Sequence, residues 1–221
     1  MALTKVIGAG LGTVTEDQVF GGATPTVTIG DAGAEDAKII FDGNAQDFYI
    51  GLDDSADELI IGKGSALGTT DYIRAKADGQ VTLPYQPCFS ATADTTNIPL
   101  QTQTTVALSG ERFDVGSNLD SNTFTAPITG KYLFCFMFYF SSVDADHTTL
   151  DAHIKTSNKQ YQVTFSPDHF LNSDSNFSIT GSMICDMDAN DTAYIEIIVP
   201  NSGAAQMDVE TASAFSGYLV A

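Results

Sequence analysis

Short hydrophobic segments separated by turn residues dominate the chain. No long segment places apolar residues at the i, i+3, i+4 and i+7 positions that one face of a helix requires. The apolar runs are instead short and bounded by Gly, Asp, Asn, Ser and Thr, which is the pattern of β-strands joined by turns. The pattern therefore predicts an all-β protein.

The spacing of these segments divides the chain into three parts. Residues 1–25 are rich in Gly and Thr, and we interpret them as an N-terminal docking arm. Residues 26–85 carry short segments between acidic turns, whereas residues 86–221 carry longer segments with more aromatic residues. The strands expected in the middle part are 26–30, 38–41, 47–52, 58–62, 72–75 and 80–83.

Isoleucine recurs at a period near eleven in the first two parts. Ile-Gly pairs begin at Ile7, Ile29, Ile50 and Ile61, and Ile40 and Ile73 extend the series. A unit with one short strand cannot enclose a core, so such repeats gain one by stacking on each other or on other chains. We interpret residues 26–85 as a β-repeat shaft; the alternative is an irregular β-meander in a monomer.

The segment 131–140 predicts an assembly. Because side chains alternate across a strand, one face carries aromatic residues and the other carries Leu133, Cys135, Met137 and Tyr139. A two-sheet sandwich covers only one face, so we expect a second copy of the chain to cover the other. The alternative is a tightly filled core in a monomer. The residues assigned to the trimer interface or core are Tyr132, Phe134, Phe136, Phe138, Phe140 and Tyr218.

Composition narrows the possible partners. The chain has 28 acidic and 9 basic residues and a net charge of −19. Nucleic acid and anionic membranes would repel such a chain, and no apolar run is long enough to insert into a membrane. Cys88, Cys135 and Cys185 are far apart without Cys-x-x-Cys spacing, so we expect free thiols in a reducing compartment, although the fold could still bring one pair together.

Acidic residues between 144 and 153 are the one candidate for a metal site. Asp144, Asp146 and Asp151 offer the hard oxygen ligands that Ca²⁺ prefers, with two histidines nearby. The alternative is a solvated loop between strands. Gly-x-Ser-x-Gly, phosphate-loop and His-Glu-x-x-His motifs are missing, so we expect a protein that is not an enzyme and needs no cofactor beyond this possible Ca²⁺.

From residue 87 onward the sequence resembles the complement-type globular head domain, a jelly roll of the tumour-necrosis-factor-like superfamily. About 135 of the 221 residues are covered, and Asn190 stands where the family has glycine. The resemblance implies a jelly-roll sandwich that forms a homotrimer through aromatic strands. It rests on Pro87-Cys-Phe-Ser-Ala91, Phe113-Asp114, Phe124-Thr-Ala-Pro127, Gly130, Tyr132, Phe134, Gly181-Ser182, Asp191, Tyr194 and Phe215-Ser-Gly-Tyr-Leu219.

The N-terminal parts have no Gly-x-y period and resemble appendage proteins of tailed bacteriophages instead. This resemblance implies a tail or head fibre of a virion, assembled in the bacterial cytoplasm. Its N-terminus would dock to a tail or capsid protein, and its tip would contact a host-surface glycan or protein. The alternatives are a capsid decoration protein without host contact, a glycan depolymerase on the same scaffold, and a secreted lectin, which the poor match of the N-terminus to a signal peptide disfavours.

Overall fold

The protein is built from β-strands, with a single 3-10 turn, η1 (Pro167–His169), in the part of the chain that the structure covers. The structure is a computed structural model that describes residues 17, 19–199, 203–204 and 207–221. The expected all-β class is therefore confirmed. The proposed docking arm (1–25) lies largely outside the described residues, and its described part contains no strand.

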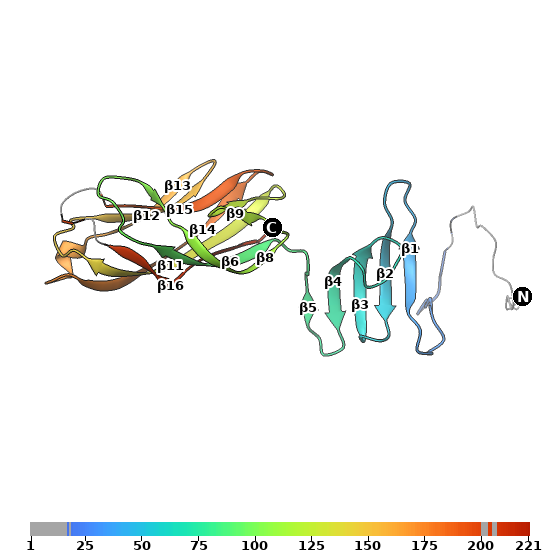
Figure 1. The fold of residues 1–221 in the computed structure, drawn as a ribbon. Coiled ribbons are helices and arrows are strands. Elements are labelled where there is room, and N and C mark those ends of the chain that lie inside the picture. Colours follow the sequence, from blue (N-terminus) through green and yellow to red (C-terminus); the bar gives the residue numbers. More distant parts are fainter. Residues whose placement is uncertain (1–16, 18, 200–202, 205–206) are drawn as a thin grey trace, which may run out of the picture.

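An antiparallel sheet comes first along the chain, and we call it the N-terminal sheet (Figure 1). Its five strands lie side by side in sequence order, as a meander. The predicted strand at 26–30 is wrong, because those residues carry no strand. The strands are β1 (Ala37–Phe41), β2 (Phe48–Asp53), β3 (Glu58–Lys63), β4 (Asp71–Lys76) and β5 (Val81–Thr82).

The period near eleven is the repeat of strand plus turn in this sheet. Ile39, Ile50, Ile61 and Ile73 are successive cross-strand partners on β1 to β4. Ile40, which the sequence placed in the series, pairs with Tyr49 and therefore points to the opposite face. The exposed face that contains the isoleucine row, called the isoleucine face below, comprises Ala37, Ile39, Phe41, Phe48, Ile50, Leu52, Leu59, Ile61, Lys63, Ile73, Ala75 and Val81.

The opposite face of the N-terminal sheet is covered by the chain itself. A side chain at Gly51 would collide with Leu67 of the β3–β4 loop, and one at Gly62 would collide with the Tyr49 ring. The glycines that follow Ile50 and Ile61 are therefore required, because the covering layer lies directly on the sheet at these two positions. The sheet is thus covered over β2 and β3 on this side, although Ile40 of β1 remains 40% exposed, and it is open on the isoleucine side.

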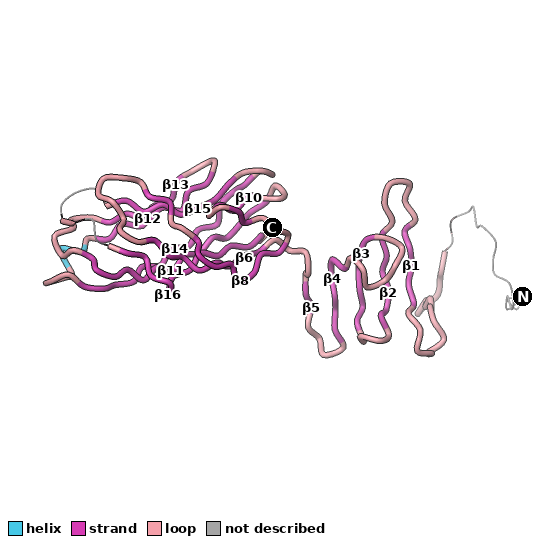
Figure 2. The backbone as a smooth tube through the Cα atoms, viewed as in Figure 1, coloured by secondary structure: helices cyan, strands magenta, loops and turns pink. Residues whose placement is uncertain are grey.

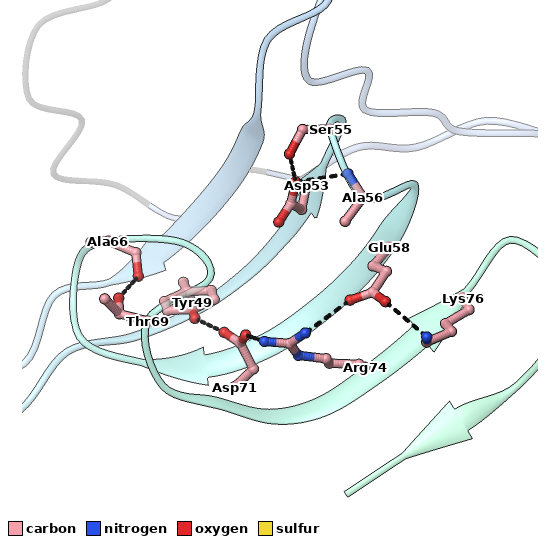
Figure 3. A network of polar contacts seen from close by, with 10 residues as sticks. All are labelled: Tyr49, Asp53, Ser55, Ala56, Glu58, Ala66, Thr69, Asp71, Arg74 and Lys76. Atoms are coloured by element: carbon pink, nitrogen blue, oxygen red, sulfur yellow. Dashed lines mark hydrogen bonds and ion pairs between the residues drawn. The ribbon is translucent and has the colours of Figure 1, made fainter. Parts of the chain in front are cut away.

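Hydrogen bonds and ion pairs between polar side chains stabilise this covered face (Figure 3). The Tyr49 hydroxyl donates to Asp71 Oδ1 at 2.5 Å, and Arg74 bridges Asp71 at 2.5 Å and Glu58 at 3.4 Å. Lys76 adds a second ion pair to Glu58. Burial, together with the hydrogen bond to Asp71, raises the pKa of Tyr49 to about 12, so its hydroxyl remains a donor at any physiological pH.

The second part of the chain, from β6 to β16, forms two packed sheets and is called the sandwich domain (Figures 1 and 2). One sheet has the order β14-β11-β16-β6-β8; the other has β13-β12-β15-β10-β9, with β7 beside β15. The first of these sheets is called the long-strand sheet below. The strands are β6 (Cys88–Thr95), β7 (Thr104–Thr105), β8 (Leu108–Val115), β9 (Leu119–Asp120), β10 (Thr123–Thr125), β11 (Gly130–Val143), β12 (Leu150–Thr156), β13 (Gln160–Phe165), β14 (Ser175–Met187), β15 (Thr192–Ile198) and β16 (Asp208–Leu219).

Five of the six aromatic residues of β11, all except Tyr139, fill the space between these two sheets. All five are at most 3% exposed, and Tyr132, Phe134 and Phe140 pack with aromatic residues from other strands. Of the two roles assigned to these residues, trimer interface or core, the structure gives them the core, because the second sheet of the same chain already covers their face. These core residues are Tyr132, Phe134, Phe136, Phe138 and Phe140.

Glycines let the large rings approach the backbone. A side chain at Gly217 would collide with Phe134 and Phe89, and one at Gly181 would collide with Phe136. Both glycines belong to segments that carry the resemblance noted above. Their presence follows from the size of the rings beside them.

Candidate interaction surface

The other face of the long-strand sheet is apolar and open to solvent in a single chain. Met137 and Tyr218 are 50% and 47% exposed, and Ile184 on the neighbouring strand β14 is 55% exposed. The alternation of β11 was thus predicted correctly, but the exposed surface is the Leu133–Cys135–Met137 side. We call this surface the outer face; it consists of Cys88, Phe113, Leu133, Cys135, Met137, Ile184 and Tyr218.

A shallow apolar hollow lies at the centre of the outer face. Its volume is about 420 Å³, and small residues such as Ser216 and Gly217 form its floor between larger neighbours. Leu133 and Tyr218 are cross-strand partners on one side of the hollow, and Phe113 stands on another. The hollow therefore offers space for apolar side chains of a partner.

Two of the three cysteines lie in this hollow. Cys88 and Cys135 line it as free thiols, and Cys185 is free and buried in the core, as the sequence analysis expected. Burial raises the pKa of Cys135 and of Cys88, and the negative charge of Asp114 adds to the effect at Cys88. Protonated thiols are weak nucleophiles, so these side chains act as small apolar groups.

The ends of the outer face are polar. Lys131 forms an ion pair with Asp186 at one end, and the Ser141 hydroxyl donates to Glu210 at the other. An apolar centre between polar ends is the usual arrangement of a protein–protein interface. The geometry therefore supports association through this face.

The predicted Ca²⁺ ligands are not brought together. The Asp144 carboxylate accepts the backbone N–H groups of Asp146 at 2.8 Å and Ala204 at 2.5 Å, and these bonds hold its pKa below the usual range. Asp151 lies on β12 and accepts the Thr164 hydroxyl at 2.7 Å. Within the described ranges, no group of three or more His, Cys, Asp or Glu side chains could hold a metal ion. Asp144 instead forms a hydrogen bond to Ala204, in the segment before β16.

The two histidines of that segment are buried. His147 is fully buried, and His153 lies on β12 directly opposite Glu196 of β15. Sequence spacing placed both histidines close to the candidate Ca²⁺ ligands. The strand register instead assigns His153 to a sheet position, which spacing alone could not show.

Sequence reasoning missed three residues of the outer face: Cys88, Phe113 and Ile184. Phe113 was noted only as part of the resemblance, Cys88 only there and as an expected free thiol, and Ile184 was not noted. Each occupies a strand position directly beside β11 or β16 or one strand further away. Pairing of strands distant in sequence brings them together, so no local signal identifies them.

The fold and this surface can be compared with known proteins. The family model described as "C1q domain" matches residues 88–220. The chain belongs to the C1q domain family. The match covers more than half of the chain and coincides with the sandwich domain, so the jelly-roll fold implied by the sequence is confirmed. Domains of the C1q and tumour-necrosis-factor-like type commonly form homotrimers.

Two solved structures show similarity to part of this chain. The globular domain of zebrafish complement 1qA protein shares 18% identity and covers 62% of this chain and 98% of its own, with a TM-score of 0.44. Murine APRIL at pH 8.0 shares 13% identity and covers 61% of this chain and 99% of its own, also with a TM-score of 0.44. The comparison with curated proteins gives no match. No helix among the described residues is long and apolar enough to span a membrane.

Proposed function

We propose that the protein is a homotrimeric, non-catalytic appendage of a bacteriophage virion, in which the C1q domain forms the tip that contacts the host surface. The observation that carries the proposal is the outer face. It is an apolar sheet surface that the chain's own core leaves uncovered, in a family whose domains commonly form homotrimers.

Burial of the outer face would supply the free energy of assembly. Fully burying a large apolar side chain contributes about 1.5–3 kcal/mol, and half-exposed side chains such as Met137 and Tyr218 would contribute roughly half of that. Leu133 and Phe113 would add further apolar area around the central hollow. In a threefold arrangement each chain gives one such face to the shared axis.

A trimer suits attachment because it places three identical binding sites on one rigid assembly. Three weak contacts on one rigid assembly gain avidity through their high effective concentration. The net charge of −19 per chain keeps the assembly away from nucleic acid and anionic membranes, so a glycan or protein on the host surface is the proposed partner. Free thiols fit assembly in the reducing bacterial cytoplasm.

The virion role is supported by the resemblance of residues 1–85 to phage appendage proteins. In this proposal residues 1–25 dock to a tail or capsid protein, and residues 26–85 form the shaft. Antibody labelling of intact particles, viewed by electron microscopy, tests the location. Label on a tail or head fibre is expected, and particles without label would contradict the virion role.

Host attachment has its own test. The fluorescently labelled protein should bind the cells that the particle infects, and the assembly-deficient variant Met137→Asp should bind much more weakly because avidity is lost. Equal binding by both would contradict the role of the trimer in attachment. Labelled particles with no binding of the protein to cells would instead indicate a decoration protein. Release of oligosaccharides from host glycans would contradict the non-catalytic proposal.

A further inference from the structure

The isoleucine face of the N-terminal sheet is a second open apolar surface, separate from the outer face of the C1q domain. Its side chains come from all five strands, and Ile39, Ile50 and Ile61 are 46%, 37% and 37% exposed. The largest apolar patch of an ordinary monomer covers about 300–600 Å² and is often functional. A sheet that exposes one whole apolar face in water therefore requires a cover.

The described chain does not supply that cover. The opposite face is closed by Leu67, Tyr49 and the ion pairs of Asp71 and Glu58. Val27 and Ile29 run beside the isoleucine face and help to line a hollow of about 280 Å³, but they are themselves 58% and 47% exposed. The N-terminal sheet is thus complete on one side only.

The isoleucine face lacks the carboxylates that would oppose contact between identical chains. Its single charged strand position is Lys63, whereas Asp53, Glu58 and Asp71 point to the covered face. The chain has 28 acidic and 9 basic residues, so identical copies repel each other in general. Because the strand carboxylates lie on the covered face, this repulsion is weakest where two isoleucine faces would meet. The face that would meet the other copies is the face with no negative charge.

The row of isoleucines also favours a copy of the same chain over an unrelated partner. Neighbouring strands lie about 4.8 Å apart, so the row formed by Ile39, Ile50, Ile61 and Ile73 repeats at that spacing across the strands. A second copy presents the same side chains at the same spacing, so the side chains of one row can fit into the gaps between the side chains of the other row. An unrelated surface would need to reproduce this period.

The proposed trimer of C1q domains would hold the N-terminal sheets of the three copies close together. Residues 83–87 join β5 to β6, and five residues span at most about 18 Å. Two adjacent linker residues contact the parts of the chain on either side: the Tyr85 ring contacts Tyr72 of β4 with centroids 5.7 Å apart, and Gln86 Nε2 donates to the Leu219 carbonyl of β16 at 2.8 Å. A trimer of C1q domains would therefore keep three isoleucine faces together at an effective concentration of about millimolar.

We infer that the isoleucine face packs against the isoleucine faces of the other two copies, so that three N-terminal sheets form the walls of a stalk with an apolar interior. The covered faces, with their ion pairs, then point outward to solvent. This inference rests on the proposed homotrimer, and it adds a second interface that is independent of the outer face.

Cysteine substitution in the full-length chain tests the inference. Ile50→Cys places a thiol at the centre of the isoleucine face, and Ala66→Cys places one on the exposed loop over the covered face as the matched control. The mass in solution, the rate of maleimide labelling and cross-linking by a short bis-maleimide are measured for each. Mass spectrometry of the linked peptides separates these cysteines from Cys88, Cys135 and Cys185.

A trimer in which residue 50 is labelled at least about tenfold more slowly than residue 66, and is linked to residue 50 of another chain, supports the inference. A trimer in which residue 50 is labelled as fast as residue 66 overturns it and leaves the proposed trimer of C1q domains intact. Protection of residue 50 without links between chains also overturns it, because the N-terminal arm or another protein then covers the face. A monomer overturns both proposals.

Discussion

Leu133 of β11 and Tyr218 of β16 are cross-strand partners on the face of their sheet that points away from the core. Their chain neighbours Phe134 and Leu219 lie on the other face and are buried in the sandwich. Adjacent residues of these strands therefore belong alternately to the core of the chain and to the surface proposed to bind its copies. The proposed trimer depends on that second surface and not on the aromatic core.

A charge at the centre of the outer face should prevent assembly without unfolding the domain. In Met137→Asp a carboxylate replaces a half-exposed apolar side chain, which leaves the core intact but would bury a charge in each interface. We expect a folded monomer by light scattering and circular dichroism. Gln160→Asp adds the same charge at an exposed position of β13 and should remain trimeric. A stable trimer of Met137→Asp would contradict the assignment of the interface.

Glycine at position 181 is required by the ring of Phe136. Gly181→Ala would place a methyl group against that ring and should lower the free energy of unfolding by about 1–3 kcal/mol. Gly110→Ala in β8 is the control, since its methyl group would meet nothing closer than 3.9 Å. Chemical denaturation measures both. Equal stability of the two variants would show that the space beside Phe136 is not tight.

Arg74 links the two buried carboxylates on the covered face of the N-terminal sheet. Arg74→Met would leave Asp71 with Tyr49 and Glu58 with Lys76 as remaining partners, and we expect a local loss of about 1–3 kcal/mol. Arg74→Lys should lose less, because one ammonium group can still pair with one carboxylate. Hydrogen exchange of the β2–β4 amides in the full chain measures the loss. Unchanged exchange in Arg74→Met would contradict the role of the network.

The stability that Asp144 provides through its hydrogen bonds to Asp146 and Ala204 should depend on pH. Backbone N–H donors from Asp146 and Ala204 lower the pKa of Asp144 in the folded state, so its stabilisation is present above the ordinary carboxyl pKa of 3.8. It is lost as the pH falls through the lowered folded pKa. Asp144→Asn should therefore weaken stability near neutral pH and flatten its acid dependence. Asp120→Asn, at the end of β9, is the control for a change of charge alone. An acid profile of Asp144→Asn that parallels the unsubstituted protein would contradict this assignment.

Local sequence patterns predicted most of the strands. The pairing of strands that are distant in sequence determines which of their side chains are buried and which are exposed. Five of the six short strands before residue 85, the alternation of β11 and the C-terminal fold follow from periodicity and from the motifs around Phe124 and Phe215. The choice between core and surface for Phe136 and Met137 could not be made locally, because both faces of the strand are apolar. It depends on which face the second sheet covers.

The same limit applies to the polar residues. Asp144 and Asp151 are close in sequence, but the strand that begins at Leu150 carries Asp151 away into a sheet position. Ile39 and Ile40 are equivalent by composition, and only the pairing of β1 with β2 places Ile39 in the isoleucine row. Register is a property of paired strands, so a single segment does not reveal it.

The central claim is that the outer face joins copies of this chain, and the mass of the full-length protein in solution tests it most directly. Light scattering after gel filtration, confirmed by native mass spectrometry, should give three times the 23.4 kDa of one chain. A soluble monomer at the same concentrations, with Met137 and Tyr218 exposed to solvent, would contradict the account.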